Sequence, residues 1–236
     1  MKFSDIPGQR ETIGRLISTV KSERVSHAQL FTGPEGCGNL ALALTYARYV
    51  SCENRSDLDS CGTCKSCVKY EKMIHPDLHF VFPVVKKDTD PVSDKFIDKW
   101  REFAAVSPYF SLTKWLNYIG AGNAQGLIFT SEAAEILRKL TLKSYESDFK
   151  VMIIWLPEKM HQVTANKLLK LIEEPPEKTL FLLVSDEPDK IVPTIISRCQ
   201  LVRIPSFTPS DISSYLIERF RIHKGRSDDI ARVSNG

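Results

Sequence analysis

Short apolar segments alternate with segments of helical periodicity along most of the chain, and this alternation constrains the fold more than any other feature. We predict strands at 27–31, 78–84, 151–156, 179–185 and 200–204. Predicted helices lie at 9–22, 40–50, 68–74, 131–142 and 164–174, and a further helix ends near Arg198. Strands that are apolar throughout, such as 151–156, are typical of a parallel sheet buried on both faces. The sequence therefore predicts an α/β fold, with a parallel sheet flanked by helices.

The predicted sheet makes residues 1–206 one domain, which two segments interrupt. A cysteine-containing module occupies 52–67, and an insertion rich in charged and aromatic residues spans about 86–123. We expect the aromatic side chains of the insertion to lie in a core or on a partner-facing surface, and we assign them no function. Residues 207–236 begin a helical domain, with residues 210–211 (Ser-Asp) as the cap of its first helix. Since a helical domain of typical size needs about 50 residues or more, we expect its C-terminal part to have been cut off.

Composition excludes several classes of protein. Apolar residues make up 42% and charged residues 26% of the 236 positions, which excludes intrinsic disorder. The longest apolar runs are far shorter than the 18 or more residues of a membrane span, and residues 1–10 contain no apolar signal core. The 32 basic and 29 acidic residues give a net charge of +3 without a long run of like charge, so electrostatics neither requires nor excludes a nucleic-acid partner. We therefore expect a soluble, cytoplasmic protein with no membrane partner.

Four of the six cysteines fall in one short window with the spacing C-x8-C-x2-C-x2-C. They are Cys52, Cys61, Cys64 and Cys67. A CxxC step lets two thiolates from one tight turn reach a single tetrahedral metal, and four such ligands leave no position for water or substrate. Two disulfides or free core thiols are the alternatives, and a reducing compartment and a polar, glycine-containing context disfavour both. We therefore predict one structural zinc, with Cys37 and Cys199 as isolated thiols.

A glycine-rich segment follows the first predicted strand and precedes a helix, which is where phosphates bind in nucleotide-binding folds. Residues 33–40 (GPEGCGNL) have the length and glycine placement (Gly33, Gly36 and Gly38) of the phosphate loop GxxxxGK[ST]. Asn39 stands where the lysine would contact the β and γ phosphates, and Leu40 stands where a hydroxyl would hold magnesium. The backbone amides could still cradle an anion, but the two losses should cost several kcal/mol of triphosphate binding. We therefore expect no tightly bound ATP.

The strand at 151–156 lacks the acidic pair that organises magnesium and the attacking water in nucleotide hydrolases. Trp155 and Leu156 occupy the positions of that pair, and neither side chain can bind a metal. The losses of the lysine, the hydroxyl and the acidic pair argue against ATP hydrolysis, so we predict that the chain by itself is not an enzyme.

Several segments resemble the AAA+ subunits of the bacterial sliding-clamp loader, a component of DNA polymerase III. The matching segments are 3–9 (FSDIPGQ), 27–34 (HAQLFTGP), the four-cysteine module, 75–77 (HPD), 165–176 (ANKLLKLIEEPP) and 197–199 (SRC). They follow the family's order over nearly the whole chain, and the combination of LLKxxEEPP with SRC is very specific. The resemblance implies an AAA+ fold in which residues 207–236 begin a helical lid domain.

Within this family, gamma/tau subunits carry an intact phosphate loop and acidic strand end, whereas the delta-prime type is known for a defective site. The departures at Asn39, Leu40, Trp155 and Leu156 make the delta-prime type the better match. The resemblance then implies a non-hydrolysing subunit of a five-membered ring that opens the replicative clamp. The implied partners are the gamma/tau and delta subunits, the sliding clamp, and primed DNA through the assembled ring.

Arg198 is the functional residue that the resemblance implies. In that family the Ser-Arg-Cys segment presents an arginine across the subunit boundary to the ATP of a neighbouring gamma/tau subunit. A guanidinium delivered in trans offsets charge on the transferring phosphoryl group. Without the resemblance, Arg198 would be interpreted as a solvated arginine at a helix end. Ser185 occupies the position of a phosphate-sensing residue, and without a competent site we expect it to cap the next turn.

Two other functions compete with this interpretation. The chain could be a divergent gamma/tau-like ATPase that still binds ATP through the loop backbone and the lid. It could also be a zinc-bearing DNA-binding protein, but the cysteine module lacks a basic recognition helix, since Lys65 and Lys69 are too few.

Overall fold

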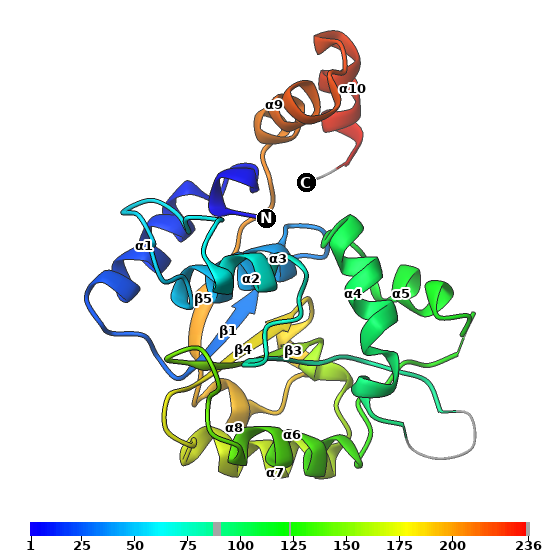
Figure 1. Cartoon of the computed structure of the whole chain (residues 1–236). Coiled ribbons are helices and arrows are strands. Elements are labelled where there is room, and N and C mark those ends of the chain that lie inside the picture. Colours follow the sequence, from blue (N-terminus) through cyan, green and yellow to red (C-terminus); the bar gives the residue numbers. More distant parts are fainter. Residues whose placement is uncertain (87–90, 123, 235–236) are drawn as a thin grey trace.

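A five-stranded parallel sheet forms the centre of the protein (Figure 1). The computed structural model describes residues 1–86, 91–122 and 124–234, so positions 87–90 and 123 of the predicted insertion and 235–236 of the predicted lid lie outside it. In sheet order the strands are β2 (Leu78–Val81), β3 (Lys150–Trp155), β4 (Thr179–Ser185), β1 (Ala28–Thr32) and β5 (Gln200–Arg203). Every neighbouring pair is parallel. The predicted parallel sheet is therefore confirmed.

Helices cover both faces of the sheet (Figure 1). One face packs against α1 (Arg10–Lys21), α2 (Asn39–Val50), α3 (Lys65–Glu71), α4 (Ile97–Val106) and α5 (Leu112–Tyr118). The other face packs against α6 (Glu132–Thr141), α7 (Gln162–Glu173) and α8 (Pro193–Ile196). β3 illustrates the cause, because its side chains alternate between the two apolar layers: Ile153 and Trp155 join the first, and Met152 and Ile154 the second.

The insertion folds around buried aromatic side chains. Trp100 of α4 and Trp115 of α5 are fully buried, with ring centroids 5.2 Å apart and nearly perpendicular planes. The Trp115 indole N–H donates to the carbonyl oxygen of Pro83 at 2.8 Å, and Trp100 lies 5.3 Å from Trp155 of β3. The described part of the insertion is therefore anchored on the sheet by its aromatic core.

The second predicted strand is shorter than expected, because a side chain replaces its ladder bonds. β2 ends at Val81, and Ser93 then pairs with Phe82: the Phe82 N–H donates to Ser93 Oγ, and the Ser93 hydroxyl lies 3.0 Å from the Phe82 carbonyl oxygen. Glu132 holds Ser93 in turn, since its carboxylate accepts the Ser93 backbone N–H at 2.7 Å.

Glu132 makes the stability of the fold dependent on pH. Burial raises the pKa of Glu132 from 4.5 to about 7, against the lowering effect of Ser93 and of Lys139, which itself pairs with Asp94. A carboxyl group with a raised pKa stabilises the fold fully below its unfolded pKa, and this contribution is lost as pH rises through the folded value. Relative to Glu132→Gln, the free energy of unfolding of the unaltered chain should fall by about 2.5 kcal/mol between pH 5 and pH 8.

Urea denaturation at the two pH values measures this difference. Glu135→Gln is the matched control one turn along α6, because its partner Arg138 lowers the pKa of Glu135 and leaves it ionised throughout this range. Identical pH profiles for the unaltered chain and Glu132→Gln would contradict the assignment.

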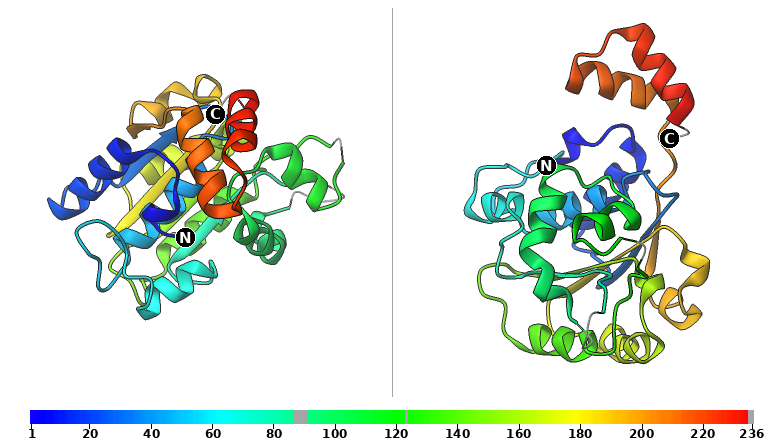
Figure 2. Two further views of the ribbon diagram at one scale, coloured as in Figure 1. Left: turned by 90° about the horizontal axis from the view of Figure 1, so that it is seen from above. Right: turned by 90° about the vertical axis from the view of Figure 1, so that its right-hand side faces the viewer.

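Two C-terminal helices, α9 (Pro209–Phe220) and α10 (Lys224–Ser234), form a hairpin beyond the N-terminal segment (Figure 2). The cap of α9 is Thr208 rather than the predicted 210–211: the Thr208 hydroxyl accepts the N–H of Asp211, and the Asp211 carboxylate accepts the N–H of Thr208. This reciprocal pair satisfies two backbone donors that a cap at 210–211 would leave free. No helix in the described residues is long and apolar enough to cross a membrane.

Candidate functional site

The four predicted metal ligands lie together at one end of α3. The Sγ atoms of Cys52, Cys61, Cys64 and Cys67 all lie within 4.8 Å of one another. Four sulfurs around a tetrahedral zinc would be separated by about 3.8 Å, given Zn–S bonds of about 2.3 Å. Backbone N–H groups point at the sulfurs, among them that of Cys64 at Cys61 Sγ (3.3 Å) and that of Cys67 at Cys64 Sγ (3.4 Å). The N–H groups of Cys64 and then Thr63 lower the pKa of Cys61 to about 5, whereas burial raises the pKa of Cys52 to about 12 and also raises that of Cys67. The cluster could therefore hold one metal ion.

The cysteine module is fastened to the N-terminal segment of the chain. The carboxylate of Asp59 accepts the backbone N–H groups of Phe3 and Ser4 at 3.1 and 3.0 Å. The Lys2 ammonium donates to the carbonyl oxygen of Cys61 at 3.1 Å. A change that loosens the cysteine module is therefore expected to loosen the first residues of the chain as well.

The glycine-rich loop joins β1 to α2 at the carboxyl edge of the sheet, as predicted. A Cβ at Gly33 would lie 2.2 Å from the carbonyl oxygen of Ile204, so only glycine fits there. Gly38, at the start of α2, has φ +87°, which also favours glycine. The loop therefore keeps the backbone requirements of a phosphate loop although its chemical side chains differ.

The Asn39 side chain turns back into the protein instead of pointing toward a ligand. Asn39 is only 4% exposed, and its amide nitrogen donates to the carbonyl oxygens of Gly33 (3.0 Å) and Ser185 (3.2 Å) and to the carboxylate of Asp186 (3.1 Å). Its amide oxygen accepts from Cys37 Sγ at 2.8 Å. All its hydrogen-bonding groups are used within the protein, so Asn39 ties the loop to the end of β4.

The surroundings of the loop are acidic. Burial raises the pKa of Asp186 to about 6, with Glu158 and Glu35 acting in the same direction against the hydrogen bond from Asn39. Above that pH the Asp186 carboxylate is charged and repels phosphate oxygens. Sequence reasoning missed Asp186, because an acidic residue after a strand carries no signal that it will reach the loop.

The other strand ends lack catalytic groups in the expected places. Trp155 and Leu156 are both buried, and Leu156 has φ +57° with its N–H on the carbonyl oxygen of Val184 at 2.7 Å. The Ser185 hydroxyl accepts the N–H of Glu187 at 3.2 Å, which confirms its predicted role as a cap of the next turn. The carboxyl edge therefore brings together the loop, Trp155, Ser185 and Asp186.

Arg198 lies away from the loop, at the opposite end of the edge strand. Arg198 lies before the first residue of β5, whereas the loop lies after the last residue of the parallel neighbour β1. The length of β5, about 13 Å, therefore separates Arg198 from the edge of the sheet that carries the loop. The guanidinium pairs with Glu173 at 2.5 Å and donates to the carbonyl oxygen of Thr194 at 2.9 Å, and the side chain is 38% exposed. Glu173, the first acidic residue of the EEPP segment, was not predicted as its partner. Arg198 is therefore a partly exposed surface residue, held within the chain by Glu173 and Thr194.

Comparison with known proteins identifies the family. The family model described as "DNA polymerase III, delta subunit" matches residues 8–208. The chain belongs to this family of DNA polymerase III clamp-loader subunits. A relative from Bacillus subtilis, DNA polymerase III subunit delta', is 31% identical over 86% of this chain and 50% of its own length. The gamma/tau subunit of Mycobacterium bovis is 29% identical over 83% of this chain and 27% of its own length.

The fold of this clamp-loader family member is AAA+-like. The Thermotoga maritima RuvB Holliday junction branch migration motor superimposes with a TM-score of 0.54 at 11% identity, over 98% of this chain and 58% of that one. The chain spans about half the length of the Bacillus relative and about a quarter of the Mycobacterium relative.

Proposed function

We propose that this chain is a non-hydrolysing, delta-prime-type subunit of the clamp loader, which acts on the ATP of a neighbouring subunit through Arg198. Its partners would be gamma/tau and delta subunits, the sliding clamp, and primed DNA through the assembled ring. Residues 1–206 would form the AAA+ domain and 207–236 the start of the lid. A zinc ion on the four cysteines would have a structural role, since four thiolates leave no open position for substrate.

The state of Asn39 is the observation that carries the non-hydrolysing role. A catalytic lysine at this position would extend to the phosphates, whereas the Asn39 amide is fully used by Gly33, Ser185 and Asp186. Binding a triphosphate would also bring its charge next to the Asp186 carboxylate, and no acidic residue at positions 155–156 could recruit magnesium to offset it. Three independent features thus oppose ATP binding and hydrolysis by this chain.

We expect the isolated chain to bind ATP no more tightly than about millimolar, which corresponds to roughly −4 kcal/mol. Isothermal titration calorimetry with ATP and magnesium measures this directly, with an intact gamma/tau subunit as the positive control. Micromolar binding would instead favour the divergent gamma/tau-like ATPase.

Arg198 supports the second half of the proposal. Its ion pair with Glu173 is exposed at the surface, and such pairs contribute about 0 to 1 kcal/mol. The guanidinium can therefore leave Glu173 at little cost in free energy when a neighbour's phosphate is near. Its contact with that phosphate would stabilise the complex much more, because a site that excludes water strengthens electrostatic interactions. An arginine that is positioned but weakly held suits action across a subunit boundary.

A further inference from the structure

Two aromatic side chains of the insertion lie directly over the phosphate loop. Tyr109 and Phe110, between α4 and α5, are here called the aromatic plug. A Cβ placed on Gly38 would lie 3.0 Å from the Tyr109 ring and 3.2 Å from the Phe207 ring. The Tyr109 ring therefore lies against the last glycine of the loop, and Phe110 lines the space above the loop beside it.

A hollow of about 20 Å³ lies over the loop. Its walls are the loop, the aromatic plug and the side chains that end β3 and β4: Gly36, Gly38, Asn39, Leu40, Pro108, Tyr109, Phe110, Trp155 and Asp186. Such a volume holds about one water molecule. This hollow is too small for a phosphate group while the plug is in place, whatever residue stands at position 39.

The plug is anchored on both sides. The Phe110 ring centroid lies 5.1 Å from that of Trp155 and 5.6 Å from that of Trp100, nearly edge-on to both, so Phe110 is part of the aromatic core of the insertion. The Tyr109 ring lies 6.2 Å from Phe207, in the segment that leads into α9. The plug therefore connects the insertion, the loop and the segment before the C-terminal hairpin.

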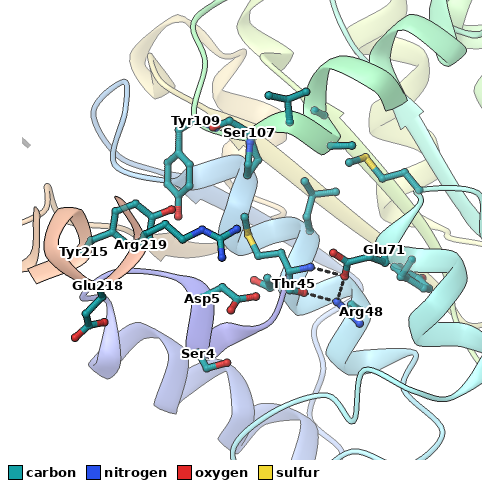
Figure 3. A pocket seen from close by; sticks show the side chains of 18 of the residues that line it. Ser4, Asp5, Thr45, Arg48, Glu71, Ser107, Tyr109, Tyr215, Glu218 and Arg219 are labelled. Carbon is teal, nitrogen blue, oxygen red and sulfur yellow. Dashed lines mark hydrogen bonds and ion pairs between the residues drawn. The ribbon is translucent and has the colours of Figure 1, made fainter. Parts of the chain in front are cut away.

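Tyr109 also reaches the hairpin itself. It lines a second cavity of about 460 Å³ between the sheet domain and α9, where it points toward the same region as Tyr215 and Arg219 (Figure 3). Burial raises the pKa of Tyr109, and its hydroxyl has no hydrogen-bond partner among the described residues. The ring is thus held by packing rather than by a hydrogen bond to the described residues.

We propose that the aromatic plug is a built-in occupant of this chain's own nucleotide site: it excludes phosphate from the loop and connects the sheet domain to the C-terminal hairpin without a nucleotide. This inference rests on the proposed non-hydrolysing function. It adds a second reason for the absence of nucleotide binding, one that lies outside the loop sequence. Restoring the two chemical residues of the loop is then insufficient for nucleotide binding.

The test is an ADP titration by isothermal calorimetry of the full chain and three variants. These are Asn39→Lys with Leu40→Thr (the restored loop), Tyr109→Ala, and the combination of all three changes. We expect saturable ADP binding only in the combined variant, at least tenfold tighter than in the restored loop alone. The restored loop with Tyr145→Ala is the matched control, because Tyr145 is an exposed tyrosine outside the site and should not rescue binding.

Hydrogen exchange at the backbone amides of residues 36–40 gives a second readout that needs no ligand. Tyr109→Ala should raise their exchange rates at least several-fold, whereas Tyr145→Ala should not. The inference is overturned if the restored loop binds ADP as tightly with Tyr109 present as without it. It is equally overturned if the combined variant keeps its circular dichroism spectrum yet neither binds ADP nor exchanges faster. Tight ADP binding by the unaltered chain would contradict the proposed function as well, so the two failures are distinguishable.

Discussion

Replacing Arg198 with alanine is expected to abolish most ATP hydrolysis at the one active site that this subunit would face in the assembled clamp loader. An arginine supplied in trans contributes on the order of a thousandfold or more where chemistry limits the rate. The DNA-stimulated ATPase rate of the complex should fall by about the fraction that this single site contributes. The rate of clamp loading should fall more strongly, because loading needs every step of the cycle. Steady-state ATPase and a clamp-loading assay on the reconstituted complex measure the two effects.

Variants of the same region separate a catalytic role of Arg198 from a structural one. Arg203→Ala is the matched control, because Arg203 is an exposed arginine at the other end of β5. Arg198→Lys should rescue poorly, since a point charge lacks the planar fork of the guanidinium. Glu173→Gln should leave hydrolysis nearly intact, because Glu173 only holds the arginine in the free chain. If the complex with Arg198→Ala loads clamps at the unaltered rate, the assignment is wrong.

The sequence predicted the sheet and the altered loop because both depend on local patterns. Uniformly apolar runs such as 151–156 are compatible with few structures other than a sheet buried on both faces, and β3 is indeed buried along its whole length. The loop departs from a phosphate loop at the two residues that carry its chemistry, so the sequence alone predicts the loss of that chemistry. The His75-Pro76-Asp77 segment also acts locally and structurally: Asp77 accepts three backbone N–H groups of 145–147 at 2.6 to 2.8 Å.

The features that the sequence did not predict depend on contacts between distant segments. Tyr109 and Phe110 resemble any aromatic pair in a loop, and only the packing of the insertion on Trp155 places them over Gly38. The pair of Arg198 with Glu173 likewise joins two separate elements, α7 and the turn before β5. Periodicity and spacing carry no information about such long-range contacts, so the position of Tyr109 and Phe110 beside the loop emerged only from the tertiary structure.

Removing zinc from the four-cysteine module is the other change with a large expected effect. We expect about one zinc per chain by elemental analysis, and structural zinc sites in small domains contribute apparent free energies of up to about 10 to 16 kcal/mol. Here the sheet has its own core, so chelation should loosen the module at 52–67 and the N-terminal segment joined to it through Asp59 and Lys2, rather than unfold the chain.

Cys67→Ser should reproduce the effect of chelation, because Cys67 is fully buried within the cluster. The expected results are loss of zinc, a melting temperature lower by several degrees, and faster hydrogen exchange in residues 1–5 as well as in the module. Cys199→Ser is the control, since Cys199 lies outside the cluster and should change neither zinc content nor exchange. Metal-free protein with four titratable thiols and an unchanged melting temperature would show that the cysteines do not form a zinc site. Faster exchange confined to the module would keep the zinc but contradict its coupling to the N-terminal segment.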